Sequence, residues 1–256
     1  MPFSGSEYVS VIIIGGGQAG LSASYCLKER GITDHLILEK HRVGHAWRSE
    51  RWDSFCLVTP NHQCRLPGHH YGGDDPEGFM VKDEIVDFIE AYVSKYNPPI
   101  CEGVSVTSVT KRDGFFHVTT NVGEWHCDDV IVAMGCFHTP ILPRGAETIP
   151  SHIKQIHSAD YKNPDQIPEG ETIVVGSGQS GVQMMEELHR FGRKVHLCLG
   201  NAPRSPRRYR GKDAVTWLEE MGYYETTFGE HPDKNKALSS TNHYLTGRDG
   251  GHEIDL

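Results

Sequence analysis

The feature that most constrains the fold of this chain is a strand–turn–helix pattern that occurs twice. Residues 10–22, SVIIIGGGQAGLS, and residues 172–183, TIVVGSGQSGVQ, each place a β-branched run before Gly-x-Gly-x-x-Gly and a helix-compatible stretch after it. Such a continuous apolar run is typical of a strand buried on both faces of a parallel sheet. The glycines permit a tight turn into a helix whose N-terminus can accept a diphosphate. The repeat therefore predicts two dinucleotide-binding βαβ units.

Around the first turn we expect a strand over residues 8–14, a helix over 18–30 that ends at Gly31, and a second strand over 35–40. Residues 43–78 are rich in Gly, Pro, His and aromatic residues, which indicates long, ordered loops.

Farther along the first half, apolar residues at helical spacing predict an amphipathic helix over 82–96. From 104 to 134 the alternation of apolar and polar residues predicts an antiparallel β-meander that ends in a buried strand at 130–133.

A proline-punctuated stretch, residues 149–171, marks a domain transition, after which strand, turn, helix and strand recur. A short helix is expected near 214–221. The predicted fold is α/β, with two Rossmann-like FAD/NAD(P)-binding three-layer domains and the meander inside the first. Residues 1–150 form the FAD-binding domain and 151–256 the NADPH-binding domain. Both are expected to be incomplete, and the second carries an inserted loop and helical region from about residue 203.

The first glycine turn is followed by an acid. Gly15 permits the tight turn, Gly17 allows the backbone to approach a pyrophosphate, and Gly20 allows the helix to pack on the sheet. Glu39 ends the next strand nineteen residues after Gly20, where a carboxylate can accept both hydroxyls of an adenosine ribose. The residues assigned to this nucleotide are Gly15, Gly17, Gln18, Ala19, Gly20, Glu39 and Lys40.

The second glycine turn is followed by cations instead. The same spacing leads from Gly181 to Gly200, and five basic residues lie between 204 and 212. A missing acid together with arginines suits the 2′-phosphate of NADPH. The alternative is a solvated basic loop or a weak polyanion site. The residues assigned to NADPH are Gly176, Gly178, Gln179, Ser180, Gly181, Arg204, Arg207 and Arg208.

Composition narrows the class of protein. A net charge of −9 over 256 residues disfavours nucleic acid as the main partner. The apolar runs are too short to span a bilayer, and the first residues lack a secretory signal, so we expect a cytoplasmic protein and no membrane partner. Seven scattered cysteines without C-x-x-C favour a reducing compartment. The His, Cys and Asp residues of 61–75 match no standard zinc spacing, and no metal is expected.

Several motifs resemble the flavin-dependent monooxygenase superfamily with two dinucleotide-binding domains, which includes flavin-containing monooxygenases, Baeyer–Villiger enzymes and bacterial flavoprotein relatives. LEKHRVGHAWR, residues 38–48, resembles the segment that lines FAD and implicates Glu39, Gly44, Trp47 and Arg48. DDVIVAMGCFHTPILP resembles the strand and turn that flank the flavin and implicates Gly135. IHSADYKN matches a linker signature in part. His45 stands where many relatives have a second glycine, and Met134 replaces the usual threonine.

This resemblance implies an NADPH-dependent FAD monooxygenase. NADPH would reduce FAD, O2 would add at flavin C4a, and the hydroperoxide would transfer one oxygen atom to nitrogen, sulfur or a ketone of a small molecule. Relatives often place an asparagine beside the flavin edge in the region of LVTPNHQ, which makes Asn61 the candidate catalytic residue. A turn-forming role for Asn61 is the alternative.

Relatives also have a later segment that completes both domains, and no such segment precedes Leu256. We therefore expect a shortened chain or a second polypeptide that supplies the rest, and a homo-oligomer whose copy number the sequence leaves open. Two other functions remain. A flavin-dependent pyridine-nucleotide disulfide-type reductase would need a dithiol pair, which the cysteine spacing does not offer. A non-catalytic FAD/NADPH-binding regulatory subunit would bind both nucleotides without turnover.

Overall fold

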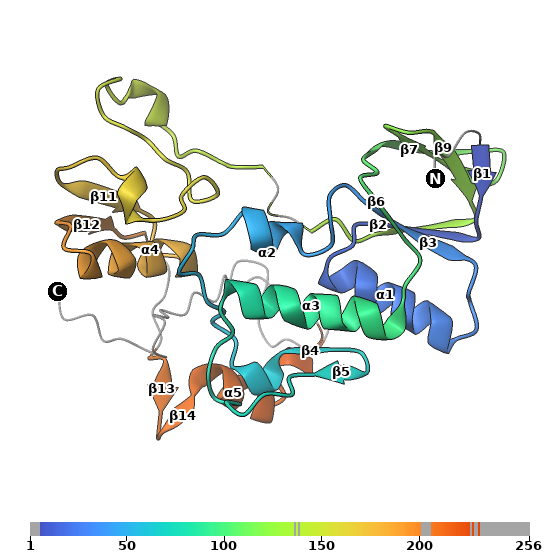
Figure 1. The fold of residues 1–256 in the computed structure, drawn as a ribbon, viewed down its shortest axis with the longest axis horizontal. Coiled ribbons are helices and arrows are strands. Elements are labelled where there is room, and N and C mark those ends of the chain that lie inside the picture. The colour runs from blue at the N-terminus through green and yellow to red at the C-terminus, as the bar shows by residue number, and fades with distance from the viewer. Residues whose placement is uncertain are drawn as a thin grey trace. The chain divides into compact units, whose positions relative to one another are not determined.

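The computed structural model describes residues 6–135, 137, 139–200, 206–225, 227 and 230 (Figure 1). The chain divides into two compact units. Unit 1 comprises Met1–Glu50, Arg65–His70 and Asp83–Pro143; unit 2 comprises Arg51–Cys64, Tyr71–Lys82 and Arg144–Leu256.

Unit 1 is built on a parallel sheet in which a helix connects the first two strands. β2 (Val11–Ile14), β3 (His35–Glu39), β6 (Ile100–Glu102) and β10 (Asp129–Val132) lie in the order β10-β2-β3-β6, and every neighbouring pair is parallel. α1 (Gln18–Glu29) runs from β2 to β3 and contacts both strands. This confirms the predicted α/β class and the first βαβ unit.

The predicted strand over residues 8–14 is wrong as a single element. β1 (Ser6–Tyr8) pairs with β9 (Glu124–Cys127) in a second sheet, whereas β2 belongs to the parallel sheet. The chain changes sheets at Ser10, whose N–H and hydroxyl both donate to Asp34 Oδ2, at 2.9 and 2.6 Å. An apolar run alone does not reveal such a break, because both halves are extended.

The predicted meander is confirmed. β7 (Val106–Arg112), β8 (Phe115–Thr120) and β9 pair antiparallel, and the sheet order is β1-β9-β8-β7. Its inner face packs on the parallel sheet through one buried cluster, whose members include Trp125, Val118, Ile12 and Leu38. Unit 1 is therefore layered as helix, parallel sheet and meander. The last strand of the predicted region is less buried than expected, since Val132 is 65% exposed.

The remaining elements of unit 1 include the predicted amphipathic helix, α3 (Lys82–Tyr96), which buries Ile85, Val86, Ile89 and Tyr92. Residues 43–78 are mainly loops, as expected, but they also form short elements that the sequence did not predict. In unit 1 these are α2 (His45–Ser49), β4 (Arg65–Leu66) and β5 (His69–His70).

Unit 2 contains the second βαβ unit. β11 (Thr172–Val175) and β12 (Val195–Cys198) are parallel, and α4 (Gln179–Arg190) connects them. Met184 and Leu188 of α4 pack against Trp52 and Tyr161 in one buried cluster.

The other elements of unit 2 are short. The predicted helix near 214–221 is α5 (Ala214–Glu220), and it follows a hairpin that the sequence reading missed. The rest are η1 (Asn61–Gln63), η2 (Ala146–Thr148), η3 (Pro164–Gln166), β13 (Arg208–Tyr209), β14 (Lys212–Asp213) and η4 (Tyr223–Glu225).

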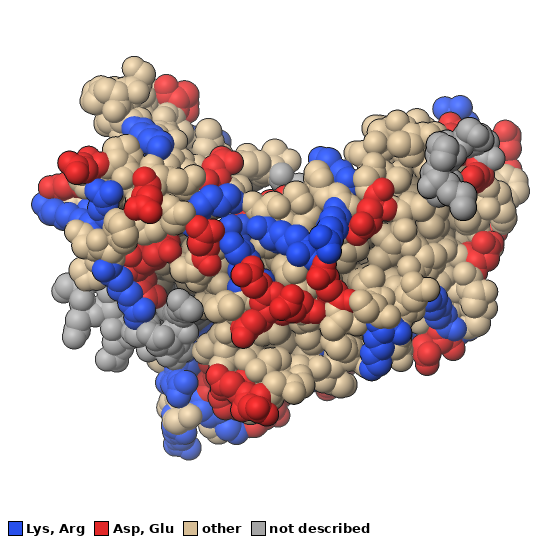
Figure 2. Space-filling model, in the orientation of Figure 1, with Lys and Arg blue, Asp and Glu red and all other residues tan. Residues whose placement is uncertain are grey.

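The charged side chains on the face shown in Figure 2 are of both signs, and Lys and Arg are interspersed with Asp and Glu. Among the described residues, no helix combines the length and the apolar composition that a membrane span requires.

The layering of unit 1 makes a prediction for its stability. Trp125 is 1% exposed and packs between the meander and the parallel sheet, whereas Phe115, on the outer face, is 44% exposed. Trp125→Ala should lower the free energy of unfolding by about 3–5 kcal/mol, because it leaves a cavity in the core. Phe115→Ala should cost less than about 1 kcal/mol. Urea denaturation of both variants measures the difference; equal losses would contradict the layered packing.

Candidate dinucleotide-binding turns

The first glycine turn fits helix α1 tightly onto strand β2. Gly15 has φ +107°, and a Cβ there would lie 2.6 Å from the carbonyl oxygen of Ala133. A Cβ at Gly20 would lie 1.9 Å from the carbonyl oxygen of Gly15. Neither position has room for a side chain, and the backbone of Gly15 also lies in a region that other residues rarely adopt. The roles predicted for these two glycines, a tight turn and close helix packing, match this geometry.

The outer side of the same turn is open. Gly17, Gln18 and Ala19 are exposed, and a Cβ at Gly17 would meet nothing within 4 Å. Gly17 is the N-cap of α1, and no side chain caps the helix there. The first N–H groups of a helix lack partners within the helix, and the helix dipole favours an anion at this end. The turn thus has the exposure and the donors that a diphosphate requires.

Glu39 lies beside this turn, at the end of β3. The N–H of Gly16 donates to Glu39 Oε2 at 2.6 Å, and the N–H of His41 donates to Oε1 at 2.8 Å. Its carboxylate therefore stands at the same sheet edge as the glycine turn, which is where the sequence spacing placed it. A ribose hydroxyl can donate to the remaining lone pairs of these oxygens. The ribose contact itself stays a prediction.

The segment after β3 forms α2. Gly44, its N-cap, has φ +79°, and the N–H groups of Trp47 and Arg48 both donate to the carbonyl oxygen of Gly44 at 3.1 Å. The guanidinium of Arg48 forms an ion pair with Glu90 of α3, and its Nε is buried without a hydrogen-bond partner among the described residues. Of the other residues assigned to FAD, Lys40 is exposed.

Gly135 follows β10 at the same sheet edge. It is exposed and has φ +74°. Two residues earlier, the N–H of Ala133 donates to the carbonyl oxygen of Ile14 at 2.8 Å, so this stretch runs beside the first glycine turn. The predicted turn next to the nucleotide is therefore in place, while its contact with a flavin stays a prediction.

The second glycine turn repeats the geometry of the first. Gly176 has φ +106°, and a Cβ at Gly181 would lie 2.1 Å from the carbonyl oxygen of Gly176. Gly178 is the N-cap of α4, again without a side-chain cap. Gln179 is half-buried and Ser180 is exposed. Unlike Gly15, Gly176 has open space beside it, since a Cβ there would meet nothing within 4 Å. The duplicated sequence thus folds into a duplicated cradle.

The side chains predicted to make the second cradle cationic are only partly where the sequence placed them. Gly200, which the sequence spacing matched to Glu39, follows β12 and is exposed. The structural equivalent of Glu39 is Leu199, because the N–H of Gly176 donates to the carbonyl oxygen of Cys198 as that of Gly15 donates to Leu38, so no acid stands at this position. Arg208 is exposed on β13, and Arg204 lies outside the described residues.

Arg207 does not lie at the surface. It is 5% exposed, its Nε lies 2.6 Å from Asp213 Oδ2, and its guanidinium stacks 4.7 Å from the centre of the Phe79 ring. Burial lowers the pKa of Arg207, and the charge of Asp213 opposes that change. The described contacts of its guanidinium are internal, and a contact with NADPH would require it to leave Asp213.

Asn61, the candidate catalytic residue, is also buried, at 4% exposure. Its Nδ2 donates to the carbonyl oxygen of Asp75, and its backbone N–H donates to that of Gly78, both at 2.9 Å. Its Oδ1 is buried without a partner among the described residues. These hydrogen bonds connect Asn61 to the segment from Asp75 to Gly78, which agrees with the structural alternative of a turn former. The catalytic role stays a prediction.

Two acids that hold candidate residues were missed at the sequence level. Asp213 pairs with Arg207 and also caps α5, because the N–H of Val215 donates to its Oδ1 at 2.8 Å. An acid directly before a helical stretch is a recognised N-cap signal and could have identified it. Glu90, the partner of Arg48, carries no such signal, since it lies on α3, far along the chain.

Comparison with known proteins gives relatives named as oxidoreductases and relatives named as monooxygenases. The family model described as pyridine nucleotide-disulphide oxidoreductase matches residues 12–221. An "Uncharacterized oxidoreductase CzcO-like" of Geobacillus kaustophilus is 39% identical over 215 residues, which are 84% of this chain and 61% of that protein. A "Probable indole-3-pyruvate monooxygenase YUCCA1" of Arabidopsis thaliana is 30% identical over 195 residues, 74% of this chain and 47% of that protein.

A solved structure, the flavin-containing monooxygenase from Stenotrophomonas maltophilia, superposes with a TM-score of 0.73 at 27% identity, over 83% of this chain and 63% of that one. The chain spans 61% of the length of the first curated relatives that it matches.

The geometry of the first glycine turn predicts effects of different size for two substitutions. Gly20→Ala should destabilise unit 1 by at least about 2 kcal/mol, because the new methyl would overlap a backbone carbonyl that cannot move without shifting α1. Gly17→Ala should change stability by less than about 1 kcal/mol, because its φ of −80° suits alanine and the space is open. Thermal and urea denaturation check both. A Gly20→Ala variant as stable as the parent would refute the close packing.

Proposed function

The chain belongs to the pyridine nucleotide-disulphide oxidoreductase family and also to the flavin monooxygenase superfamily. From this premise we propose that it acts as an NADPH-dependent FAD monooxygenase on a small molecule. The observation that carries the proposal is the pair of glycine cradles whose neighbouring side chains differ in charge. Glu39 stands beside the first cradle, whereas the uncharged Leu199 occupies the equivalent place beside the second.

In this proposal residues 1–150 hold FAD. The open tip of the first turn, from Gly17 to Ala19, receives the diphosphate, and Glu39 accepts the ribose hydroxyls. Lys40 lies exposed beside Glu39, and the stretch at Gly135 flanks the cofactor at the same sheet edge. The buried and unpartnered Arg48 Nε supplies one further donor. When bound, the flavin supplies the electron transfer and oxygen chemistry.

Residues 151–256 hold NADPH. Gly178, Gln179 and Ser180 form the tip of the second cradle, and the missing acid after β12 removes the charge that would repel a 2′-phosphate. We assign the phosphate contact to Arg208 together with Arg204. Arg207 then has a positioning role, because its ion pair with Asp213 of β14 fixes the residue directly before β13, on which the exposed Arg208 lies.

The small-molecule substrate and O2 complete the reaction, and the oxygenated atom is nitrogen, sulfur or a ketone carbon. The relatives named as monooxygenases favour this reading over two others. The six cysteines that the structure describes form no disulfide with one another. A regulatory subunit would bind FAD and NADPH in the two cradles without oxidising NADPH.

One set of measurements separates these functions. The full chain, reconstituted with FAD, is mixed with NADPH and O2, and NADPH oxidation, peroxide release and oxygenation of a test amine, sulfide and ketone are followed. Oxygenated product supports the monooxygenase. Reduction of a disulfide reagent would favour the reductase, and tight binding of both nucleotides without NADPH oxidation would favour the regulatory subunit.

Glu39→Gln tests the first cradle. Loss of the charge should weaken FAD binding at least about tenfold, since a charge-assisted hydrogen bond is worth roughly 1.5–3 kcal/mol. Glu29→Gln, on the exposed end of α1, is the matched control and should bind FAD normally. FAD binding is measured by flavin fluorescence, and urea denaturation without FAD excludes a folding defect. Unchanged affinity in Glu39→Gln would reject the ribose role.

Arg208→Ala tests the second cradle. It should weaken NADPH binding at least about fivefold and leave NADH binding nearly unchanged, because only NADPH carries the 2′-phosphate. Arg112→Ala, an exposed arginine of unit 1, is the control for charge alone. Calorimetric titration with each nucleotide gives the ratio of the NADPH and NADH dissociation constants for each variant. Equal losses for NADPH and NADH would show that Arg208 does not read the phosphate.

A further inference from the structure

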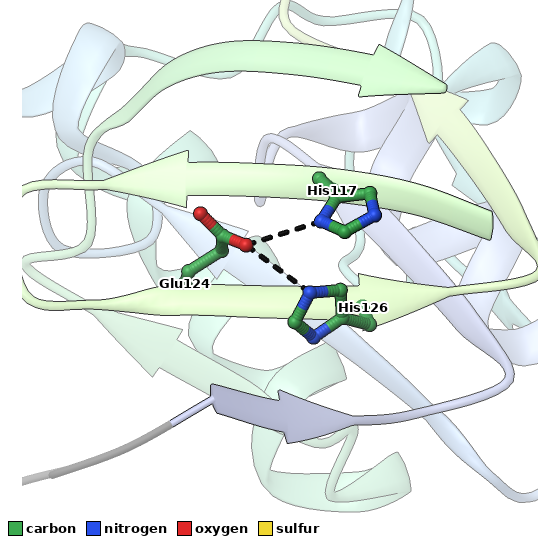
Figure 3. Close-up of side chains that lie close together, drawn as sticks. All are labelled: His117, Glu124 and His126. Carbon is green, nitrogen blue, oxygen red and sulfur yellow. Dashed lines mark hydrogen bonds and ion pairs between the residues drawn. The ribbon is translucent and has the colours of Figure 1, made fainter. Parts of the chain in front are cut away.

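We propose that His117, Glu124 and His126, on the outer face of the meander, form a binding site for a divalent transition metal, Zn²⁺ (Figure 3). The sequence predicts no metal, because the ligand spacings along the chain match no standard zinc site. This cluster arises instead from the register of a β-hairpin, and it does not depend on the proposed function.

The hairpin brings the three side chains together. His117 of β8 pairs directly with His126 of β9, and Glu124 lies two residues before His126, so all three project from the same face of the sheet. Glu124 Oε1 lies 3.1 Å from His117 Nδ1 and 3.1 Å from His126 Nε2. The three ligand atoms all lie within 4.8 Å of one another.

These separations suit a metal ion of the size of Zn²⁺. With zinc–nitrogen and zinc–oxygen bonds of about 2.0–2.2 Å and tetrahedral angles, neighbouring ligand atoms lie roughly 3.3–3.5 Å apart. Two of the observed separations are slightly shorter and the third is at most 4.8 Å, so small side-chain rotations suffice. The backbone need not move.

The scaffold under the cluster is packed in the core, and its outer side is accessible. Val118 and Trp125, the neighbours of His117 and of the two β9 ligands, point to the opposite face and are almost fully buried in the core. The side chains of His117, Glu124 and His126 are 23%, 44% and 26% exposed. An ion can therefore enter from solvent, and water can occupy a fourth position, as in zinc sites with three protein ligands.

The donor set selects the class of metal. Two imidazoles and one carboxylate suit Zn²⁺, Co²⁺, Ni²⁺ and Cu²⁺, whereas Ca²⁺ and Mg²⁺ prefer oxygen ligands throughout. The competing explanation is that Glu124 only accepts hydrogen bonds from the two histidines.

A titration of the full chain separates these explanations. Chelator-treated protein is titrated with Zn²⁺ by calorimetry and with Co²⁺ by visible absorption, which reports the coordination geometry. The test variant is His117→Ala/His126→Ala. Because the chain has 16 histidines, the matched control is His152→Ala/His189→Ala, which removes two exposed histidines of unit 2.

The parent and the control should bind one equivalent with the same affinity, and the test variant should lose that equivalent or bind it at least tenfold more weakly. Zn²⁺ should raise the melting temperature of the parent but not that of the test variant. Should the test variant fail to fold, Glu124→Gln replaces it, since this change keeps the shape and should still weaken Zn²⁺ binding at least tenfold. Zn²⁺ affinity that survives in the folded variant, or a site that Mg²⁺ fills equally well, overturns the proposal.

Discussion

The approach of Gly20 to the carbonyl oxygen of Gly15 is the contact on which the candidate site of unit 1 depends. A methyl group at Gly20 would lie 1.9 Å from that oxygen, so α1 sits closer to β2 than any side chain would allow. The helix N-terminus therefore lies at the carboxyl edge of the sheet, where β3 and β10 also end. Glu39 and Gly135 reach the same edge because β3 and β10 run parallel to β2, and the open tip of the turn faces solvent.

Unit 2 uses the same contact, between Gly181 and Gly176, and builds a second cradle of the same shape. Since the backbones match, discrimination between two nucleotides must come from the side chains that surround each turn. An acid stands beside the first, and none stands at the equivalent place beside the second. A chain that holds two nucleotides in differently charged cradles is suited to pass electrons between them, which is the physical basis of the proposed oxidoreductase.

Acidic partners change the role of two candidate residues. Arg48 was assigned to FAD from a family resemblance and Arg207 to NADPH from its position along the chain, yet the structure pairs them with Glu90 and Asp213. Arg207 is buried and would be costly without a partner, so its pair with Asp213 stabilises the hairpin region that carries it. Arg48 is half-buried, and its pair connects α2 to α3. In the proposed function Arg207 therefore has a positioning role, and the exposed Arg208 beside it contacts the 2′-phosphate.

The sequence by itself determined both βαβ units, the meander, α3 and the glycine turns, because these depend on local periodicity and on backbone conformations that only glycine adopts readily. Only the tertiary structure decided where the chain leaves one sheet for another at Ser10, since that break depends on Asp34. It also decided the ion pair of Arg48 and the His117, Glu124 and His126 cluster, which depend on helix placement and strand register. Contacts between residues far apart in the chain leave no periodic trace in the sequence, and packing alone brings them together.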